Sequence, residues 1–250
     1  KNCEIYSCLQ HKIRDLRFQI LSSSLKMLTL QVNRIPKAAR HDGWREPAGH
    51  AARTILKCMI REYDYLVIGS GIAGMSFALK AAKKGRVAII CKTTLEEANT
   101  ALAQGGVASV TNLEVDDFDK HIHDTMVAGD WLSDPAAVDK VVRNAPALIR
   151  DLVDWGVNFD KKDDGSYDLH REGGHSEFRI LHHADNTGAE IQRGLMVQVR
   201  NDPNIDIFER HFAVEIITQH HLGKIVTRRT PDITCYGAYI LNEETEKVDT

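Results

Sequence analysis

The sequence predicts an α/β protein, in which a Rossmann-like domain with a parallel central sheet is followed by a β-meander. Two patterns carry this prediction. Apolar runs at residues 65–68 and 87–91 enclose a glycine-rich turn and a segment with helical periodicity, which is the order of a βαβ unit. From residue 205 onward, short runs of strand type alternate with turn residues, which favours an antiparallel sheet.

The composition is that of an ordinary globular protein and excludes several other classes. Of the 250 residues, 43% are hydrophobic and 27% are charged, and the net charge is −3, so a collagen-like or disordered chain is not expected. The longest apolar stretch is too short and too rich in glycine and serine to span a membrane. Five unevenly spaced cysteines do not form a disulfide framework. We therefore expect a cytoplasmic protein with no membrane span and no nucleic-acid partner.

Residues 1–58 differ in character from the rest of the chain. They carry eleven basic and four acidic side chains and show only weak apolar periodicity. Three interpretations compete: a transit peptide, a nucleic-acid-binding arm, and sequence translated ahead of a start at Met59. The third is favoured because Met59 lies just before the first convincing strand. Residues 1–58 are thus expected to be a basic extension outside the fold, and residues 59–250 to form the domain.

The glycine pattern suits a dinucleotide. Gly69 permits a tight turn out of the strand, Gly71 leaves room for a pyrophosphate against the backbone, and Gly74 lets helix and strand pack closely. The phosphates would meet unpaired N–H groups at the positive end of the helix. That helix is expected over Met75–Lys84, with Gly85 ending it.

The second strand of the unit lacks one expected feature. Its end usually offers an acidic side chain to the ribose hydroxyls, but Lys92 stands there. Taken alone, Lys92 fits either a 2′-phosphate, and therefore NADP, or a solvated lysine at a strand end. The spacing leaves both interpretations open.

Further helices, turns and strands are expected after the nucleotide unit. Asn99–Gly106 is a polar, glycine-ended loop that can lie along a flat ring or be an ordinary surface loop. Asp134 followed by proline is a good helix N-cap. The expected helices are residues 116–128, 134–155 and 188–200, the expected turns are 163–165 and 243–246, and the expected strands are 205–208, 212–218, 225–227 and 236–241. Because the meander ends in a turn, we expect that a following strand is missing.

Polar residues crowd together between Asn158 and Asn186. The run from His170 to Ser176 suits recognition of a small polar or anionic substrate. The histidine pairs at 121/123, 182/183 and 220/221 are poor metal ligands, because side chains one or two positions apart diverge on regular structure. We expect solvated histidines and no metal site.

Three segments resemble a known family. They are VIGSGIAGMS, shared by many flavoproteins, NTALAQGG, and LHREGGHSEFRILHHADNTG, which is close to specific for its family. From about Met59 to Thr250 the chain resembles the N-terminal part of the L-aspartate oxidases. These belong with the flavin subunits of succinate dehydrogenase and fumarate reductase. The resemblance implies a Rossmann-like FAD-binding domain, truncated before the capping and C-terminal helical domains.

The resemblance also implies where FAD binds. Its pyrophosphate would lie over the glycine turn, Lys92 beside the ribose, the segment from residue 99 to 106 beside the flavin, and residues 212 and 213 near the adenine. In the respiratory subunits a histidine at position 99 binds flavin covalently, so asparagine here implies non-covalent FAD. The implied cofactor-binding residues are Gly69, Ser70, Gly71, Ile72, Ala73, Gly74, Lys92, Asn99, Thr100, Ala101, Leu102, Ala103, Gln104, Gly105, Gly106, Phe212 and Ala213.

Glu172 matches the glutamate that faces the substrate in this family and is the implied catalytic residue. Its carboxylate would pair with the α-ammonium of L-aspartate, a group that succinate lacks. The structural alternative is a loop carboxylate paired with Arg171 or Arg179. The implied reaction oxidises L-aspartate to iminoaspartate with O2 or fumarate as acceptor. It is the first step of de novo NAD biosynthesis, with quinolinate synthase as the consumer of the product and a partner.

Two other functions remain open at this point. One is a flavoprotein of the fumarate reductase or succinate dehydrogenase type, against which Asn99 and the segment around Glu172 argue. The other is a non-catalytic, nucleotide-binding gene fragment. Because the family's catalytic histidine and arginine residues would lie beyond Thr250, we expect no appreciable turnover from these 250 residues.

Overall fold

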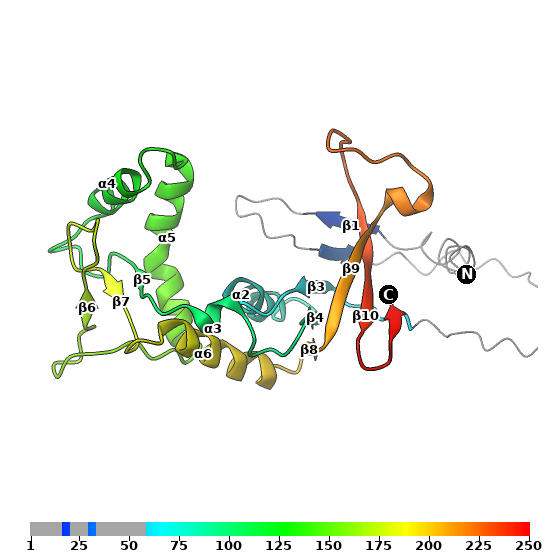
Figure 1. Cartoon of the computed structure of the whole chain (residues 1–250), viewed down its shortest axis with the longest axis horizontal. Helices are drawn as coiled ribbons and strands as arrows, with labels where there is room; N and C mark the ends of the chain where they lie inside the picture. The colour runs from blue at the N-terminus through cyan, green and yellow to red at the C-terminus, as the bar shows by residue number, and fades with distance from the viewer. Residues whose placement is uncertain (1–16, 21–29, 34–58) are drawn as a thin grey trace, which may run out of the picture. The chain divides into compact units, whose positions relative to one another are not determined.

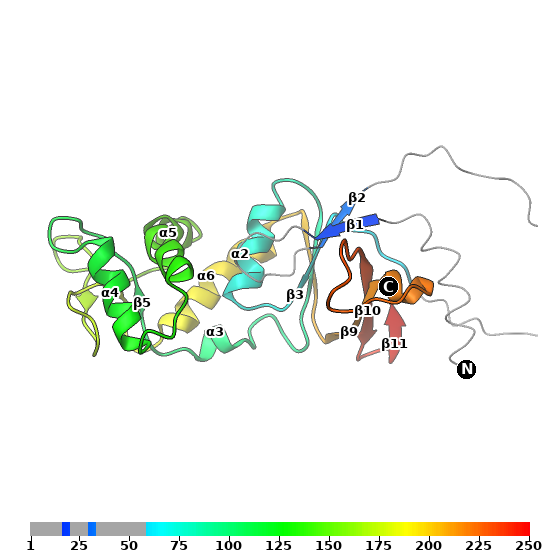
Figure 2. The same cartoon turned by 90° about the horizontal axis from the view of Figure 1, so that it is seen from above.

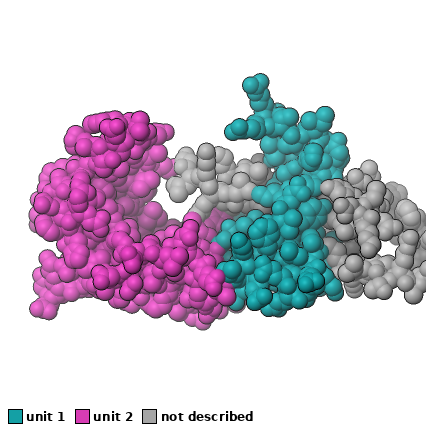
Figure 3. Space-filling view, in the orientation of Figure 1, with its two compact units in different colours: residues 1–69, 81–93, 206–250 teal, residues 70–80, 94–205 magenta. Residues whose placement is uncertain are grey.

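The structure is a computed structural model that describes residues 17–20, 30–33 and 59–250, the first two ranges by their backbone alone (Figure 1). The chain divides into two compact units (Figure 3). Of the described residues, unit 1 contains those up to 69 together with 81–93 and 206–250, and unit 2 contains residues 70–80 and 94–205.

Unit 1 is built around a sheet that contains the two strands of the predicted βαβ unit. β3 and β4 pair in parallel, with Tyr65 opposite Val87, and every residue of β4 is buried. The predicted α/β class with a parallel sheet is therefore confirmed. The strands, in sheet order, are β1 (Arg17–Ile20), β2 (Leu30–Asn33), β3 (Tyr65–Ile68), β4 (Val87–Ile90) and β8 (Ile205–Phe208).

Part of the N-terminal extension pairs with this sheet. β1 is antiparallel to β2, and β2 is antiparallel to β3, with Leu30 opposite Leu66. The sequence predicts that residues 1–58 lie outside the fold, so these two short strands differ from that expectation. The rest of the extension lies outside the described residues, and the position of the domain boundary stays a prediction.

The predicted meander forms a second, antiparallel sheet in unit 1, ordered β11-β10-β9. The strand expected to be missing after the turn at residues 243–246 is present, because β11 follows that turn and pairs with β10. Its elements are β9 (His211–Thr218), the 3-10 helix η2 (Gln219–Leu222), β10 (Cys235–Asn242) and β11 (Lys247–Asp249). The strand predicted at residues 225–227 is wrong. That segment is irregular and Ile225 is exposed, because three residues of strand type are too few to hold a place in a sheet without a paired neighbour.

Unit 2 is mainly helical. α4 and α5 lie side by side (Figures 1 and 2), and Arg143 of α5 donates to Asp119 of α4 at 2.6 Å. The helices are α2 (Ile72–Ala81), whose last residue belongs to unit 1, α3 (Asn99–Leu102), α4 (Phe118–Ala128), α5 (Pro135–Asp154) and α6 (Thr187–Asn201). A small antiparallel sheet contains, in order, β5 (Val107–Ala108), β7 (Ile180–Leu181) and β6 (Leu169–His170).

The predicted helix signals in unit 2 are confirmed. The Asp134 carboxylate accepts a hydrogen bond from the Ala136 N–H at 2.9 Å, and Pro135 opens α5. Gly156, two residues beyond that helix, has a φ of +85°, a conformation that favours glycine and ends helices. No helix in the described part of the chain is long and apolar enough to cross a membrane.

The segment between α5 and α6 contains the predicted hairpin turn. Gly165 has a φ of +83°, and Lys161 and Tyr167 form an antiparallel bridge across the turn. This turn leads into β6, and the loop from residue 171 to 179 then joins β6 to β7. The polar run of the sequence therefore lies on one small hairpin.

Candidate functional site

The glycine turn exposes backbone at the start of a helix. Gly69 has a φ of +105°, which favours glycine. Gly69, Ile72 and Ala73 are exposed, and the helix that follows is ten residues long. A Cβ added at Gly71 would lie 3.3 Å from Thr100 Oγ1, so a side chain there would crowd the turn. The turn thus leaves its backbone accessible at the positive end of α2, which suits a phosphate.

Two polar side chains of unit 2 fix this turn. The Ile72 N–H donates to Thr100 Oγ1 at 3.0 Å. Gln192 of α6 is buried, and its Nε2 donates to the carbonyls of Ser70 at 3.0 Å and Leu95 at 2.6 Å. Sequence reasoning missed Gln192, because no local pattern links a helix residue to a turn 122 positions earlier.

A short helix occupies the first half of the segment predicted as a loop at Asn99–Gly106. α3 covers residues 99–102, and residues 103–106 are irregular. The Leu102 side chain is 79% exposed, and Gln104 and Gly105 are exposed beside it. The loop prediction is therefore wrong for α3. The segment nevertheless presents an apolar side chain and open backbone, as contact with a flat ring requires.

Two glycines around this segment are required by close packing. A Cβ on Gly106 would lie 2.4 Å from the Leu181 carbonyl oxygen, and one on Gly188 would lie 2.0 Å from the Thr100 carbonyl oxygen. The Gly188 N–H also donates to the Ala103 carbonyl at 3.0 Å. The start of α6 therefore supports α3 directly, a role that the sequence pattern of Gly188 did not indicate.

In unit 1, two residues implied to flank the adenosine lie together. Lys92 follows β4, and its Nζ lies 5.9 Å from the centre of the Phe212 ring on β9. Both side chains are exposed, and Ala213 is half-buried. The Cys91 N–H donates to the Phe208 carbonyl at 2.8 Å. This hydrogen bond joins the end of β4, next to Lys92, to the end of β8, which precedes β9. A cation and an aromatic face are thus available together for a nucleoside.

Glu172 lies in the exposed loop between β6 and β7. The structure shows neither of the pairings weighed for it. The Arg171 guanidinium lies over the Phe178 ring, 5.5 Å from its centre, and Arg179 binds other carboxylates. Within the described residues, the Glu172 carboxylate makes no ion pair. It is therefore free to receive a cationic group.

Arg179 anchors the end of that loop. Its side chain is fully buried, and it donates to both oxygens of Asp116, at 2.8 and 2.7 Å, and to Asp124 at 2.5 Å. Ser176 donates to the same Asp124 oxygen through its N–H, at 2.8 Å, and through its hydroxyl, at 2.7 Å. Burial acts to raise the pKa of Asp124, but the hydrogen bonds from Ser176 and Arg179 together lower it to about 2.

The expectation of solvated histidines is wrong for one member of each pair, because each pair directs one ring into the protein interior. The prediction that paired rings diverge holds, since the partner ring is more exposed in each case. The buried members are His121, His182 and His221. The sequence predicts no metal site. Asp168, His170 and His182 nevertheless present ligand atoms within 4.8 Å of one another.

Comparison with known proteins decides the family. A family model described as an FAD binding domain matches residues 64–250. The chain belongs to this FAD-binding family. The resemblance is thereby confirmed, and FAD rather than NADP is the cofactor indicated. Within unit 2 the open turn at Gly71 and the exposed α3 segment suit a dinucleotide, and within unit 1 the Lys92–Phe212 pair suits a nucleoside. The contacts of FAD with individual residues stay predictions.

The FAD-binding chain is similar to curated L-aspartate oxidases. It is 41% identical to L-aspartate oxidase 2-b, chloroplastic, of Nicotiana tabacum, over 92% of this chain and 35% of the relative. It is 46% identical to the chloroplastic L-aspartate oxidase of Arabidopsis thaliana, over 74% and 27%, and 43% identical to the L-aspartate oxidase of Yersinia pestis, over 75% and 35%. The chain thus spans about a third of the length of these relatives.

Solved flavoproteins share its fold. A variant of E. coli quinol fumarate reductase FrdA matches with a TM-score of 0.60 and 28% identity, over 74% of this chain and 29% of that chain. Sdh1 of Mycobacterium smegmatis, in complex with UQ1, matches with a TM-score of 0.65 and 28% identity, over 76% and 32%.

Proposed function

We propose that the FAD-binding chain serves an oxidoreductase that converts L-aspartate to iminoaspartate, with O2 or fumarate as the electron acceptor. Two lines support this proposal. The curated relatives are named L-aspartate oxidases. The loop of residues 171–179 presents the carboxylate of Glu172, which has no ion-pair partner in the part of the chain that the structure describes, on a base anchored by the buried Arg179. When FAD is bound, its isoalloxazine ring supplies the redox chemistry by accepting hydride from the substrate α-carbon.

The chain's own residues would bind and orient the cofactor. The pyrophosphate would be held by N–H groups of the turn from Gly69 to Gly74, other than those of Gly69 and Ile72, which donate to the Ile90 carbonyl and to Thr100 Oγ1. The segment from Asn99 to Gly106 would cover the flavin and exclude water from it. Lys92 would lie by the ribose, and Phe212 with Ala213 by the adenine. Asn99 cannot form the covalent link that a histidine would form, so FAD would be released by denaturation.

The observation that carries the choice of substrate is the free carboxylate of Glu172. A carboxylate pairs well with the α-ammonium of an amino acid and repels the carboxylates of succinate, which has no ammonium to offer. Glu172 would therefore bind and orient L-aspartate and favour it over succinate as the substrate that is oxidised.

The experiment measures hydrogen peroxide from a chimera in which residues 59–250 replace the matching part of the Yersinia pestis relative, because the chain alone spans a third of that length. We expect oxidation of L-aspartate, and a KM about 10- to 100-fold higher after Glu172→Gln, which removes a charge-assisted hydrogen bond of about 1.5–3 kcal/mol. The matched control is Glu177→Gln in the same loop, whose carboxylate already pairs with Lys120 at 3.0 Å. Equal KM values in both variants would contradict the proposed role.

A fumarate reductase or succinate dehydrogenase type of flavoprotein is the second candidate, favoured by the solved structures with the same fold. The same chimera separates the two, since it can be assayed with succinate and with fumarate plus a reduced dye. Turnover of these dicarboxylates without L-aspartate oxidation would support the second candidate and refute the first.

The proposed reaction implies a metabolic pathway and a cellular location for the protein. Its product would feed quinolinate synthase in de novo NAD biosynthesis, so that enzyme is the proposed partner. The cysteine pattern supports a cytoplasmic location, whereas the names of the plant relatives favour a plastid. A fluorescent protein fused after Thr250 distinguishes these two locations in cells.

A further inference from the structure

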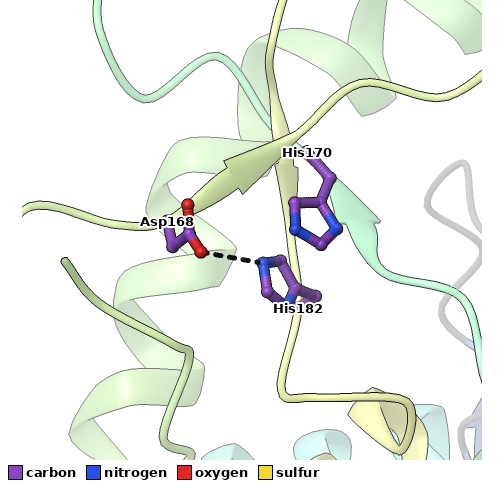
Figure 4. A group of neighbouring side chains, drawn as sticks. All are labelled: Asp168, His170 and His182. Carbon is purple, nitrogen blue, oxygen red and sulfur yellow. Dashed lines mark ion pairs between the residues drawn. The ribbon is translucent and has the colours of Figure 1, made fainter.

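One side of the β6–β7 hairpin carries three side chains that the proposed reaction does not use. They are Asp168, His170 and His182, and each offers one ligand atom to a shared space (Figure 4). Leu169 pairs with Leu181 in the antiparallel ladder, so continuing this register sets Asp168 across from His182. Asp168 and His170 are two residues apart and therefore project from the same face. The backbone register itself brings the three groups together.

His182 is a buried ring whose polar atoms are not satisfied. It is 8% exposed, and neither ring nitrogen forms a hydrogen bond. Its Nε2 lies 3.9 Å from Asp168 Oδ2, which is too long for a hydrogen bond. Two ligands that each lie about 2.1 Å from one tetrahedral ion are separated by roughly 3.4 Å. The gap between Asp168 and His182 therefore suits an ion between them better than a direct bond, and an unsatisfied buried ring is costly without one.

Asp160 can orient the ring of His182. Its Oδ2 lies 3.3 Å from His182 Nδ1, and its backbone N–H donates to the His182 carbonyl at 2.8 Å. If the ring turns slightly so that its Nδ1–H donates a hydrogen bond to Asp160, the Nε2 lone pair is left available on the side of Asp168. Ligating histidines in metal sites have this arrangement, with a carboxylate behind the ring.

His170 supplies the third ligand. Its ring lies over that of His182, with centroids 3.7 Å apart and planes at 21° (Figure 4). The side chain is exposed, so its ring can turn until a nitrogen faces the same point as His182 Nε2. Asp168 is half-buried and His182 buried, so the ion would lie at the edge of the hairpin with one side open to water.

We propose that Asp168, His170 and His182 bind a divalent transition-metal ion, with zinc as the ion that suits them best and with water as a fourth ligand. Two imidazoles and one carboxylate are ligands that zinc accepts in tetrahedral sites, whereas magnesium and calcium prefer oxygen ligands alone. The ion fastens β6 to β7 at the base of the loop that carries Glu172. The inference depends on the hairpin geometry alone and not on the proposed substrate.

The test titrates the chelator-treated 250-residue chain with Co²⁺, which reports tetrahedral coordination by its visible absorption, and then displaces the Co²⁺ with Zn²⁺. We expect one Co²⁺ per chain at this site and a higher thermal unfolding midpoint when the ion is bound. His170→Gln and His182→Gln should each lower the affinity at least tenfold, and Asp160→Asn should lower it about 10-fold, as loss of an outer carboxylate does.

Two variants serve as matched controls. His183→Gln removes the neighbouring ring, which lies 3.2 Å from the other Asp160 oxygen and outside the triad, and His123→Gln removes an exposed histidine on α4. Both should bind Co²⁺ like the unmodified chain. If His182→Gln fails to fold, as judged by circular dichroism, His170→Gln and Asp168→Asn decide. An absence of tetrahedral Co²⁺ absorption, or equal affinity in His170→Gln and the controls, would overturn the proposal.

Discussion

Arg179 is a fully buried charge that two carboxylates neutralise, and its removal should be among the most damaging single changes in unit 2. Arg179→Met leaves Asp116 and Asp124 close together without a cation, and we expect a loss of about 3–5 kcal/mol in the free energy of unfolding. Urea denaturation followed by circular dichroism measures the loss. The control is Arg143→Met, whose partners are exposed and whose loss should cost no more than about 1 kcal/mol.

The same cluster predicts a dependence of stability on acid pH. The pKa of Asp124 is lowered to about 2 in the folded protein, so its carboxylate stabilises the fold above its ordinary pKa of 3.8. This contribution is lost as the pH falls through the folded pKa, and it is worth about 2 kcal/mol at neutral pH. Urea titrations of the unmodified chain and of Asp124→Asn measure it. The difference between them should shrink as the pH falls from about 5 to about 2, and a constant difference would refute this assignment.

The structural roles of some single residues could be predicted from the sequence, and those of others could not. Gly69 and Asp134 were predicted correctly, because a positive φ and a helix N-cap are local requirements that leave a local signature. The burial and the two ion pairs of Arg179 were not predicted, because its carboxylate partners lie 55 and 63 residues earlier in the chain. The Asp168–His170–His182 cluster was missed because only the register of β6 and β7 brings it together. The alternation in Asp168-Leu-His170 was the available signal.

At the scale of elements, the close contact between α3 and α6 is possible only because residue 188 is a glycine, which has no side chain. Gly188→Ala would place a Cβ 2.0 Å from a backbone oxygen of α3, so the helices must separate. We expect a loss of about 2–3 kcal/mol in the free energy of unfolding, at the upper end of the range for overpacked cores because the close contact is with backbone. We also expect weaker FAD binding. Both are measured on the same protein by urea denaturation and by flavin fluorescence.

The control for that prediction is Gly173→Ala. Gly173 has no heavy atom within 4 Å of an added Cβ, so the change should leave the free energy of unfolding within about 0.5 kcal/mol of the unmodified value. If Gly188→Ala were equally mild, close packing at α6 would not be what holds α3 in place.

Elements with strong local signals were predicted, and elements that need a distant partner were not. The β3–α2–β4 unit was recognised because its periodicity changes from strand to helix and back around a glycine turn. The strand predicted at 225–227 failed because a run of three residues cannot form a strand without a neighbour. β6 and β7 were missed because each has two residues and is held by pairing with another strand.

For the whole molecule, the family could be predicted more fully than the geometry. The resemblance named FAD and the segments proposed to bind it, because backbone contacts to a pyrophosphate require particular glycines. It did not reveal that Gln192 holds the turn, or that Lys92 and Phe212 meet, since both contacts depend on chain segments that come together only in the folded units. The FAD-binding family was thus predictable because it depends on a local motif, and these contacts were not because they depend on packing.

Cofactor binding should therefore be visible in the stability of the whole chain. FAD binds the folded state, so at 100 times its dissociation constant it should raise the free energy of unfolding by about 2.7 kcal/mol.

Phe212→Ala removes an exposed ring proposed to contact the adenine, and we expect about 3- to 10-fold weaker FAD binding, since an aromatic contact is worth about 0.5–1.5 kcal/mol. Thermal unfolding at a series of FAD concentrations yields both quantities. Lys224→Gln, an exposed lysine outside the proposed contacts, should respond to FAD like the unmodified chain. A full response in Phe212→Ala would remove the adenine contact from the proposal. An unmodified chain that FAD does not stabilise would show that these 250 residues do not hold the cofactor by themselves.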